Sequence, residues 1–335
     1  MASCLAESSL FEKNEDSEGV NRFMDVSLIE KAAKRAGISL TSDLVQKTAC
    51  FIDVLLEANQ SVNLTAITEP TDIATRHLQD SWIPARFIAE GAAVIDVGTG
   101  AGFPGIPLRI ARPDLNMTLL DASAKRVHFL ERVIQKIFAE ELLSLQENMM
   151  KQGDLDDIDF SVAASSHLST CSQIAAGTSL PPIKPASSSI STETSRPSTV
   201  PTCSQISAET SHPSFISSPI PRVIHGRAEE LGRDPDHREK YDVAIARAVT
   251  ALPVLAEYCL PFVQLGGLFI AMKGLDDETE EAERAIHLLG GVVEEVYRYK
   301  LPEIEASFSL VIVRKKTATS LRYPRRMAAI KRRPL

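Results

Sequence analysis

A strand that runs directly into a glycine-rich turn constrains the fold of this chain more than any other feature. Residues 94–105 read VIDVGTGAGFPG, a buried-strand pattern that ends in an acid and continues into four closely spaced glycines. Glycine adopts positive φ and lets a backbone approach a ligand closely. A second apolar run, residues 117–120, ends at Asp121, where a carboxylate can accept hydrogen bonds from the two hydroxyls of a ribose. The two features together predict a site for a nucleotide-type cofactor.

The details of the turn separate two classes of cofactor. Its glycines at 98, 100 and 102 place the third one residue earlier than the dinucleotide pattern requires. Pro104 and Pro107 stand in the first turn of the following helix, where they supply no N–H to a pyrophosphate. Asp96 suits a cofactor that carries an ammonium and a sulfonium. We therefore expect S-adenosylmethionine rather than the NAD of an oxidoreductase, with a tight turn that binds no ligand as the structural alternative.

Composition and charge narrow the class of protein. The chain has 335 residues, of which 44% are hydrophobic, so it can bury a sizeable core, and its apolar runs are far too short to span a membrane. Its five cysteines form no C-x-x-C pair, which indicates neither a metal site nor a disulfide framework. The formal charge of −8 is unevenly spread, because residues 306–335 contain nine basic residues and no acid. That basic end favours a nucleic-acid partner.

The pattern of the sequence divides the chain into regions. Residues 1–24 are acidic and polar, which is typical of disorder, and residues 25–91 show the periodicity of a helical N-terminal subdomain. Residues 92–150 and 222–316 alternate β-rich runs with amphipathic helices and predict one α/β domain with a mostly parallel sheet. Residues 317–335 form a basic C-terminal tail. Strands are expected at 92–97, 117–121, 222–225, 241–246, 267–272, 292–299 and 308–313, the last two antiparallel, and helices at 124–138, 251–263 and 278–289.

Residues 151–221 interrupt the α/β domain with a low-complexity insertion. Serine, threonine, proline and alanine dominate it, and three sixteen-residue units begin at residues 170, 186 and 202. Each unit has too few large apolar side chains to offset the entropy of ordering a stacked core. The insertion is therefore predicted to be a disordered surface loop rather than a solenoid.

An ordered series of motifs resembles the RsmG (GidB) family of bacterial small-subunit rRNA methyltransferases. The resemblance covers residues 26–150 and 222–335 and rests on NLT at 63–65, RHLxDS at 76–81, IDVGTGAGFPGIPL at 95–108, LLDAxxKRV at 119–127, GRAEE at 226–230, ARA at 246–248, KG at 273–274 and RYPRR at 322–326. It implies a class I (Rossmann-like) methyltransferase with a seven-stranded sheet that methylates N7 of a guanine in 16S-type rRNA. The cofactor residues it implies are Gly98, Gly100, Phe103, Asp121, Ala228, Glu229 and Arg247.

The chemistry that this resemblance implies needs no general base, because guanine N7 has a free lone pair and rate comes from positioning and desolvation. Arg76, His77 and Asp80 are the catalytic candidates, at the rim of a pocket for the target base: Arg76 to contact phosphate or guanine O6, and Asp80 to orient a neighbouring cation. The substrate-binding candidates are Asn63, Lys273, Arg322, Arg325 and Arg326. As alternatives, His77 is a hydrogen-bonded structural residue, Arg247 a surface ion-pair partner, and Lys273 and the tail solvated cations.

The sequence leaves a second class of function open, that of a catalytically inactive RNA-binding or scaffold protein with the same fold. The expected partner is small-subunit rRNA or the ribosomal subunit, bound by a monomer without metal. We expect a cytoplasmic protein, with a plastid as the alternative, because a repeat of this kind is unusual in a compact bacterial enzyme.

Overall fold

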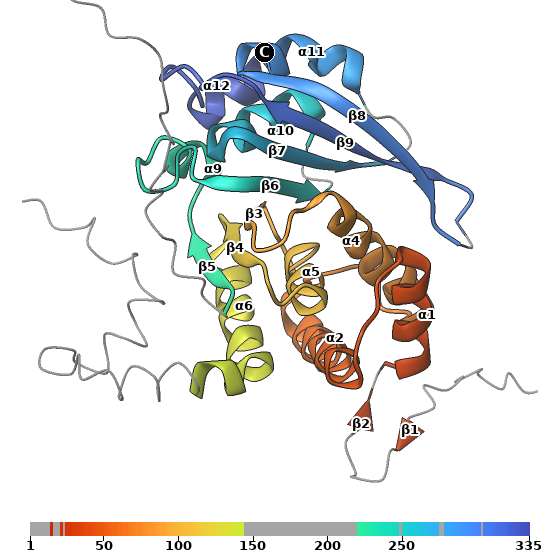
Figure 1. Ribbon diagram of the computed structural model, residues 1–335. Helices are drawn as coiled ribbons and strands as arrows, with labels where there is room; N and C mark the ends of the chain where they lie inside the picture. Colours follow the sequence, from red (N-terminus) through yellow and green to blue (C-terminus); the bar gives the residue numbers. More distant parts are fainter. Residues whose placement is uncertain are drawn as a thin grey trace, which may run out of the picture.

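The computed structural model describes residues 14–15, 21–22, 24–143, 220–247, 250–274, 278–302 and 304–335 (Figure 1). Its centre is a seven-stranded sheet with the order β5-β4-β3-β6-β7-β9-β8. The strands are β3 (Ala93–Val97), β4 (Asn116–Asp121), β5 (Arg222–His225), β6 (Tyr241–Arg247), β7 (Val263–Lys273), β8 (Gly291–Lys300) and β9 (Ser307–Lys315). Ahead of the sheet, β1 (Asn14–Glu15) and β2 (Asn21–Arg22) pair with each other.

The sheet confirms the expected fold class. Strands β3 to β7 pair in parallel, and β9 runs antiparallel to both β7 and β8, between which it lies. The strand order reverses between β3 and β6: the chain continues from β3 to β4 on one side and from β6 to β7 on the other. The two connections diverge and leave a crevice between the carboxyl ends of β3 and β6. In open α/β sheets ligands bind at this switch point, outside the carboxyl ends of the strands.

Helices cover both faces of the sheet (Figure 1). Those before the sheet are α1 (Val26–Ala36), α2 (Ser42–Val62), α3 (Pro70–Asp72), the π-helix η1 (Ile73–Gln79), α4 (Asp80–Trp82) and the 3-10 helix η2 (Ile83–Phe87). The others are α5 (Gly105–Ala111), α6 (Ala124–Ile137), α9 (Ala228–Leu231), α10 (Leu252–Cys259), the 3-10 helix η3 (Leu260–Phe262), α11 (Thr279–Leu288) and α12 (Met327–Arg332). Asp25 and Thr41 cap α1 and α2 by accepting backbone N–H bonds, as their residue types favour.

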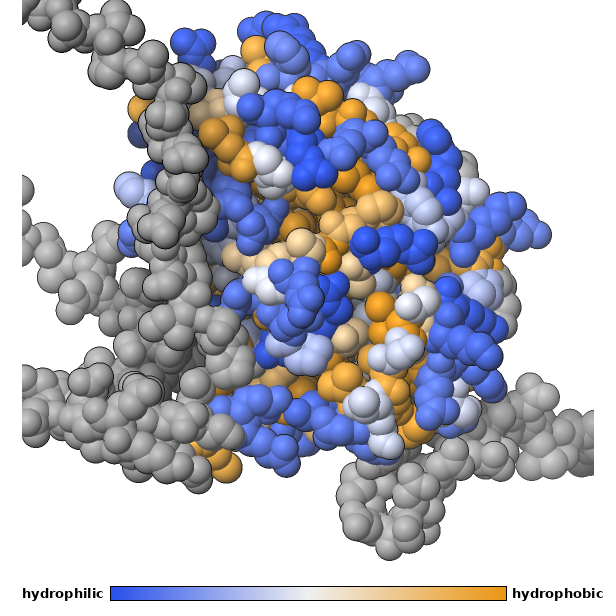
Figure 2. Space-filling view, in the orientation of Figure 1, coloured by the Kyte–Doolittle hydropathy of each residue, from blue (hydrophilic) through white to orange (hydrophobic). Residues whose placement is uncertain are grey.

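The N-terminal helices belong to the same packed body as the sheet. Phe51 and Leu55 of α2 share one buried cluster with Ile106 of α5 and Leu130 of α6. A second cluster on the other face joins the sheet to α10 and α11. Figure 2 shows hydrophobic residues in the middle of the visible face, near the end of β6, and hydrophilic residues around them. The N-terminal helices therefore pack with α5 and α6 on one face of the sheet. This packing places η1 and α4 beside the carboxyl end of β6.

Two boundaries differ by four residues from the sequence-based expectation, and the others by at most two. The helix expected to reach residue 263 ends at Cys259, and β7 begins at Val263 rather than at 267. Pro261 lies in η3 and supplies no N–H to continue an α-helix, and Val263 pairs with Tyr241 of β6. Pairing with β6 therefore makes Val263 a strand residue, although local periodicity favours a helix there.

Other expectations fall on or near residues that the structure leaves out. The stretch 1–24 is described at residues 14–15, 21–22 and 24, and the insertion 151–221 only at its last two residues. Helix α6 starts at the carboxyl end of β4 and runs back toward the amino ends of the strands. The described chain therefore breaks off after α6 and resumes before β5 on the side of the sheet away from the glycine turn. Within the described ranges there is no helix that could cross a membrane and no group of three or more His, Cys, Asp or Glu side chains placed to hold a metal.

Candidate functional site

The glycine turn between β3 and α5 folds back against β4. Gly98, Gly100 and Gly102 have φ of 75°, 62° and 94°, the left-handed region that side chains rarely adopt. Gly98 N–H donates to Leu120 O over 2.8 Å. A Cβ on Gly105 would lie 2.3 Å from Leu119 Cδ2, so only glycine allows the helix to start this close to the strand. The predicted turn is confirmed, and its backbone faces the carboxyl ends of β3 and β4.

Asp96 is a buried acid at the end of β3 with one oxygen unused. Its Oδ2 accepts the Gly105 N–H over 2.9 Å, whereas Oδ1 accepts no well-aligned hydrogen bond from the residues described, and the Thr99 hydroxyl is the polar group near enough to lower the pKa of this carboxyl. Burial raises the pKa of this carboxyl to about 6. A buried acceptor without a partner is costly, and a cationic ligand would satisfy it. The residues present therefore fit a cofactor that carries an ammonium and a sulfonium.

Asp121 at the end of β4 holds the same turn in place. Its Oδ2 accepts the Gly100 N–H over 2.9 Å and its Oδ1 accepts the Ser123 N–H over 2.8 Å. A carboxylate oxygen can accept two hydrogen bonds, so Oδ1 keeps capacity for a hydroxyl. Oδ2 also accepts a long bond of 3.5 Å from Arg126 Nη1, which a second ribose hydroxyl would have to replace. The carboxylate is thus prepositioned by backbone donors and still able to receive a diol.

The third acid of this edge follows β5. Gly226 N–H donates to Asp121 O over 3.1 Å, which brings the end of β5 against the end of β4. Glu229, in the first turn of α9, is 8% exposed, and Arg227 lies 3.9 Å from its Oε1. Ala228 begins the same helix. The expected cofactor residues of β3, β4 and β5 therefore meet at one edge.

Arg247 at the end of β6 connects this edge to the N-terminal helices. Its Nη1 donates to Asp80 Oδ2 over 3.3 Å and to Arg76 O over 3.2 Å. Its guanidinium carbon lies 5.1 Å from the centre of the Phe103 ring, within reach of a cation–π contact. Asp80 also accepts a hydrogen bond of 2.5 Å from the Tyr299 hydroxyl of β8. Arg247 is therefore held in a partly buried network, which the alternative of a surface ion pair does not describe.

His77 is held neutral in one tautomer. Arg247 Nη2 lies 3.3 Å from His77 Nδ1, and since a guanidinium can only donate, Nδ1 accepts and Nε2 carries the proton. Nε2 donates to Thr65 Oγ1 over 2.9 Å, and the ring stacks on Phe103 at 4.3 Å. Burial, followed by the charges of Arg247 and Arg76, lowers the pKa of His77 to about 3. The imidazole therefore acts as a fixed wall of the site and does not exchange protons near neutral pH.

This assignment predicts how stability depends on pH. The folded pKa of His77, about 3, lies below the usual histidine pKa of 6.5, so between these values the unfolded chain binds more protons. Its contribution is complete above pH 6.5 and is lost as the pH falls toward 3. Between pH 7 and 4.5 the free energy of unfolding should therefore fall more in the wild type than in His77→Gln, which cannot titrate. Chemical denaturation at several pH values measures this, and parallel curves would refute the neutral imidazole.

The remaining predicted residues lie in varied settings. Arg76 is half-exposed, 3.5 Å from Asp72, and Asn63 is the left-handed C-cap of α2. Lys273 donates to Glu278 over 2.7 Å and to Thr250 O, and this pair competes with the phosphate contact expected of it. Arg325 is likewise engaged, by Glu257 over 2.6 Å, because the chain end folds back onto α10. Arg322 and Arg326 are exposed.

Two members of the cluster escaped prediction as site residues. Thr65 lay inside the NLT motif but only its contact with His77 gives it a role. Tyr299 could not be predicted as a site residue, because a single tyrosine is common in a strand of alternating polarity and its partner Asp80 is remote in sequence.

Comparison with known proteins identifies the family of this chain. The GidB family, described as rRNA small subunit methyltransferase G, matches residues 44–178 and 219–305. A protein of Acetivibrio thermocellus is 34% identical over 310 residues, which are 92% of this chain and 96% of that protein. One of Alkaliphilus metalliredigens is 33% identical over 312 residues, 92% and 98% of the two chains. Both bear the name ribosomal RNA small subunit methyltransferase G. The chain therefore belongs to the GidB family.

Proposed function

We propose that this protein transfers the methyl group of S-adenosylmethionine to N7 of a guanine in small-subunit, 16S-type rRNA. The observation that carries the proposal is the meeting, at one edge of the sheet, of a glycine turn with two buried acids and a cluster around Arg247. Family membership supports it, since the relatives are named for small-subunit rRNA.

The residues of the turn fit the cofactor. Asp96 Oδ1 and the Thr99 hydroxyl would satisfy its ammonium side, and Asp121 would accept the ribose hydroxyls, with Glu229 and Ala228 beside the adenine. Phe103, 5% exposed, supplies an apolar wall. When bound, S-adenosylmethionine supplies an electrophilic methyl group on a sulfonium. We propose Gly98, Gly100 and Arg247 as further cofactor contacts.

The rim of the site fits a base that needs no proton removed. His77 is neutral and uses both ring nitrogens on Thr65 and Arg247, and the buried Asp80 accepts one hydrogen bond each from Arg247 and Tyr299. These bonds hold both side chains in position, and attack by the N7 lone pair needs no general base from either of them. We propose that Arg76, His77 and Asp80 position the guanine, and that Arg76, the exposed member, contacts O6 or a phosphate.

We further propose Asn63 as a contact to RNA, and rRNA or the assembled subunit as the partner of a monomer. Lys273 is not proposed as a contact, because its ammonium is mostly buried and paired with Glu278 over 2.7 Å. The proposed location is the cytoplasm, with a plastid as the alternative. The family match supports this activity over the alternative of an inactive RNA-binding scaffold.

Cofactor binding tests the first step of the proposal. Asp121→Ala should weaken S-adenosylmethionine binding by about 1–3 kcal/mol, roughly 5- to 150-fold, through lost charge-assisted bonds to the ribose and a loosened turn. Calorimetry measures it. Asp114→Ala is the matched control, because Asp114 precedes the same strand at its opposite end and pairs with Arg112. Equal affinities in the two folded variants would remove Asp121 from the site, and absent binding in the wild type would remove the proposal.

A further inference from the structure

We infer that residues 317–335 are a clamped segment whose outward cations form a surface for the rRNA backbone at the adenine side of the cofactor site. The inference rests on the proposed function and deepens it, because it separates the cations that bind RNA from those that hold the segment. The segment is therefore not a uniformly basic tail, since one side of it is held against the protein and the other carries exposed cations.

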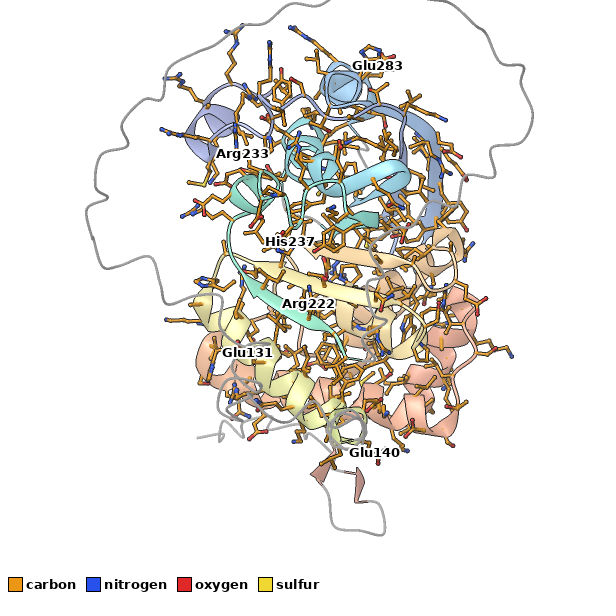
Figure 3. All side chains as sticks on the ribbon, turned by 60° about the vertical axis from the view of Figure 1, so that its left-hand side comes forward. Glu131, Glu140, Arg222, Arg233, His237 and Glu283 are labelled. Carbon is orange, nitrogen blue, oxygen red and sulfur yellow. The ribbon has the colours of Figure 1, made fainter. Side chains whose placement is uncertain are left out.

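Two arginines of the loop after α9 bind the backbone of this segment. Arg238 donates to Thr319 O over 2.6 Å and to Tyr323 O over 2.9 Å. Arg233, which lies beside α12 in Figure 3, donates to Pro324 O over 2.7 Å and to Arg322 O over 3.2 Å. Carbonyl oxygens held by guanidinium groups fix the path of residues 319–324.

A buried acid then holds the inward side of the segment. Glu257 of α10 is fully buried and accepts the Arg325 backbone N–H over 2.8 Å and its guanidinium over 2.6 and 2.9 Å. Upstream, Lys315 is also fully buried, and its Nζ donates to Leu260 O over 2.7 Å. Both cations are therefore structural, and neither is available to RNA.

The cations that point outward have no such partners. Arg322, Arg326, Lys331, Arg332 and Arg333 are all exposed, and no ion pair or side-chain hydrogen bond joins any of them to another described residue. Five unpaired cations on one short segment are unusual for a surface that only needs to be soluble, since solvated charges of both signs usually alternate. They provide the single-sign field that a polyphosphate requires.

The position of this surface connects it to the cofactor site. Arg326 and Met327 line an open groove of about 710 Å³ together with Arg227, Arg233, Glu229 and Glu230. Glu229 is the acid that we place beside the adenine, and Arg227 Nη1 reaches Met327 Sδ at 3.1 Å, so α9 and α12 are in contact. Glu230 is the exposed acid of the groove, and the cations around it outnumber it. An RNA strand on this surface would therefore run past the cofactor edge, and this geometry favours RNA over a membrane.

Replacing outward cations tests the surface directly. In Arg326→Gln/Lys331→Gln/Arg332→Gln, the slope of log Kd against log salt for small-subunit rRNA should fall by about two units, since each lost phosphate contact removes about 0.7. The matched control is Lys31→Gln/Lys34→Gln/Arg35→Gln, three exposed cations of α1, which lies across the sheet from α12 (Figure 1). The control should keep the wild-type slope, and both variants should keep the wild-type Tm and S-adenosylmethionine affinity.

Labelling of the wild-type protein gives a readout that needs no variant: bound RNA should protect Lys331, and not Lys31, from amine-reactive reagents. An unchanged slope in the first variant, an equal loss in both, or protection of neither lysine would overturn the inference. So would a loss of binding to anionic phospholipid vesicles without a loss of RNA binding. If the wild type itself neither bound this RNA nor methylated it, the proposed function would fail first, and the two failures are distinct.

Discussion

Arg247→Met should lower the single-turnover rate of methyl transfer by about 100-fold or more, while the protein stays folded. The guanidinium is the one group that joins β6 to Asp80, His77 and the Phe103 ring among the contacts described at this edge. Misplacing reacting groups by about 1 Å can cost two orders of magnitude in rate. Rapid-quench transfer of labelled methyl at saturating cofactor and RNA measures it.

Two further variants separate positioning from stability. Arg247→Met leaves the buried Asp80 without its cation, which also destabilises the fold, but Asp80→Leu/Arg247→Met removes the orphaned charge and should recover much of the lost Tm. The double variant should remain inactive. Arg86→Met is the matched control, because Arg86 bonds Tyr297 of the same strand as Tyr299 but lies outside the cluster, and it should keep most of the activity. Recovery of the rate in the double variant would show that Arg247 only stabilises the fold.

Arg325→Met should lower the free energy of unfolding by about 3–5 kcal/mol. It leaves Glu257, fully buried, as an uncompensated charge, and breaking a buried ion pair from one side has this cost. For a domain of this size the Tm should fall by about 10 °C. Denaturant titration and calorimetry measure both quantities.

The control for this prediction is another arginine–glutamate pair. Arg314 and Glu294 approach to 2.6 Å but are both partly exposed, so Arg314→Met should cost less than about 1 kcal/mol. Glu257→Leu/Arg325→Met should regain most of the stability. Similar losses from the two single variants would show that burial of Glu257 does not set the strength of the pair.

The sequence predicted the sheet well because its buried strands carry strong local signals. The runs that form β3, β4 and β6 are short and mostly apolar, which is typical of a strand buried on both faces. These strands could therefore be predicted without knowing what packs against them. The order of the last strands was different: β9 inserts between β7 and β8, and nothing in the two runs shows which of them pairs inward. The π-helix η1 was also unforeseen, since its helical pattern does not differ from that of an α-helix.

Within the candidate site, the sequence could predict residues and not their partners. Gly98, Asp121 and Arg247 were placed by motif, and strand ends bring them to one edge. The neutral state of His77 depends on burial and on Arg247, and the structural role of Arg325 depends on Glu257, which gave no sign of burial in an amphipathic helix. Such pairings arise only when remote elements pack.

The most direct test of the account replaces the target guanine of the rRNA with 7-deazaguanine. The analogue keeps the pairing edge and the exocyclic amino group and loses only the N7 lone pair. Methyl transfer to this analogue under single-turnover conditions should be abolished, with RNA binding nearly unchanged. Nucleoside analysis of the RNA that carries the natural guanine should show 7-methylguanosine after the reaction. Continued transfer to the 7-deaza substrate would place the methyl group on another atom and would contradict the proposed function.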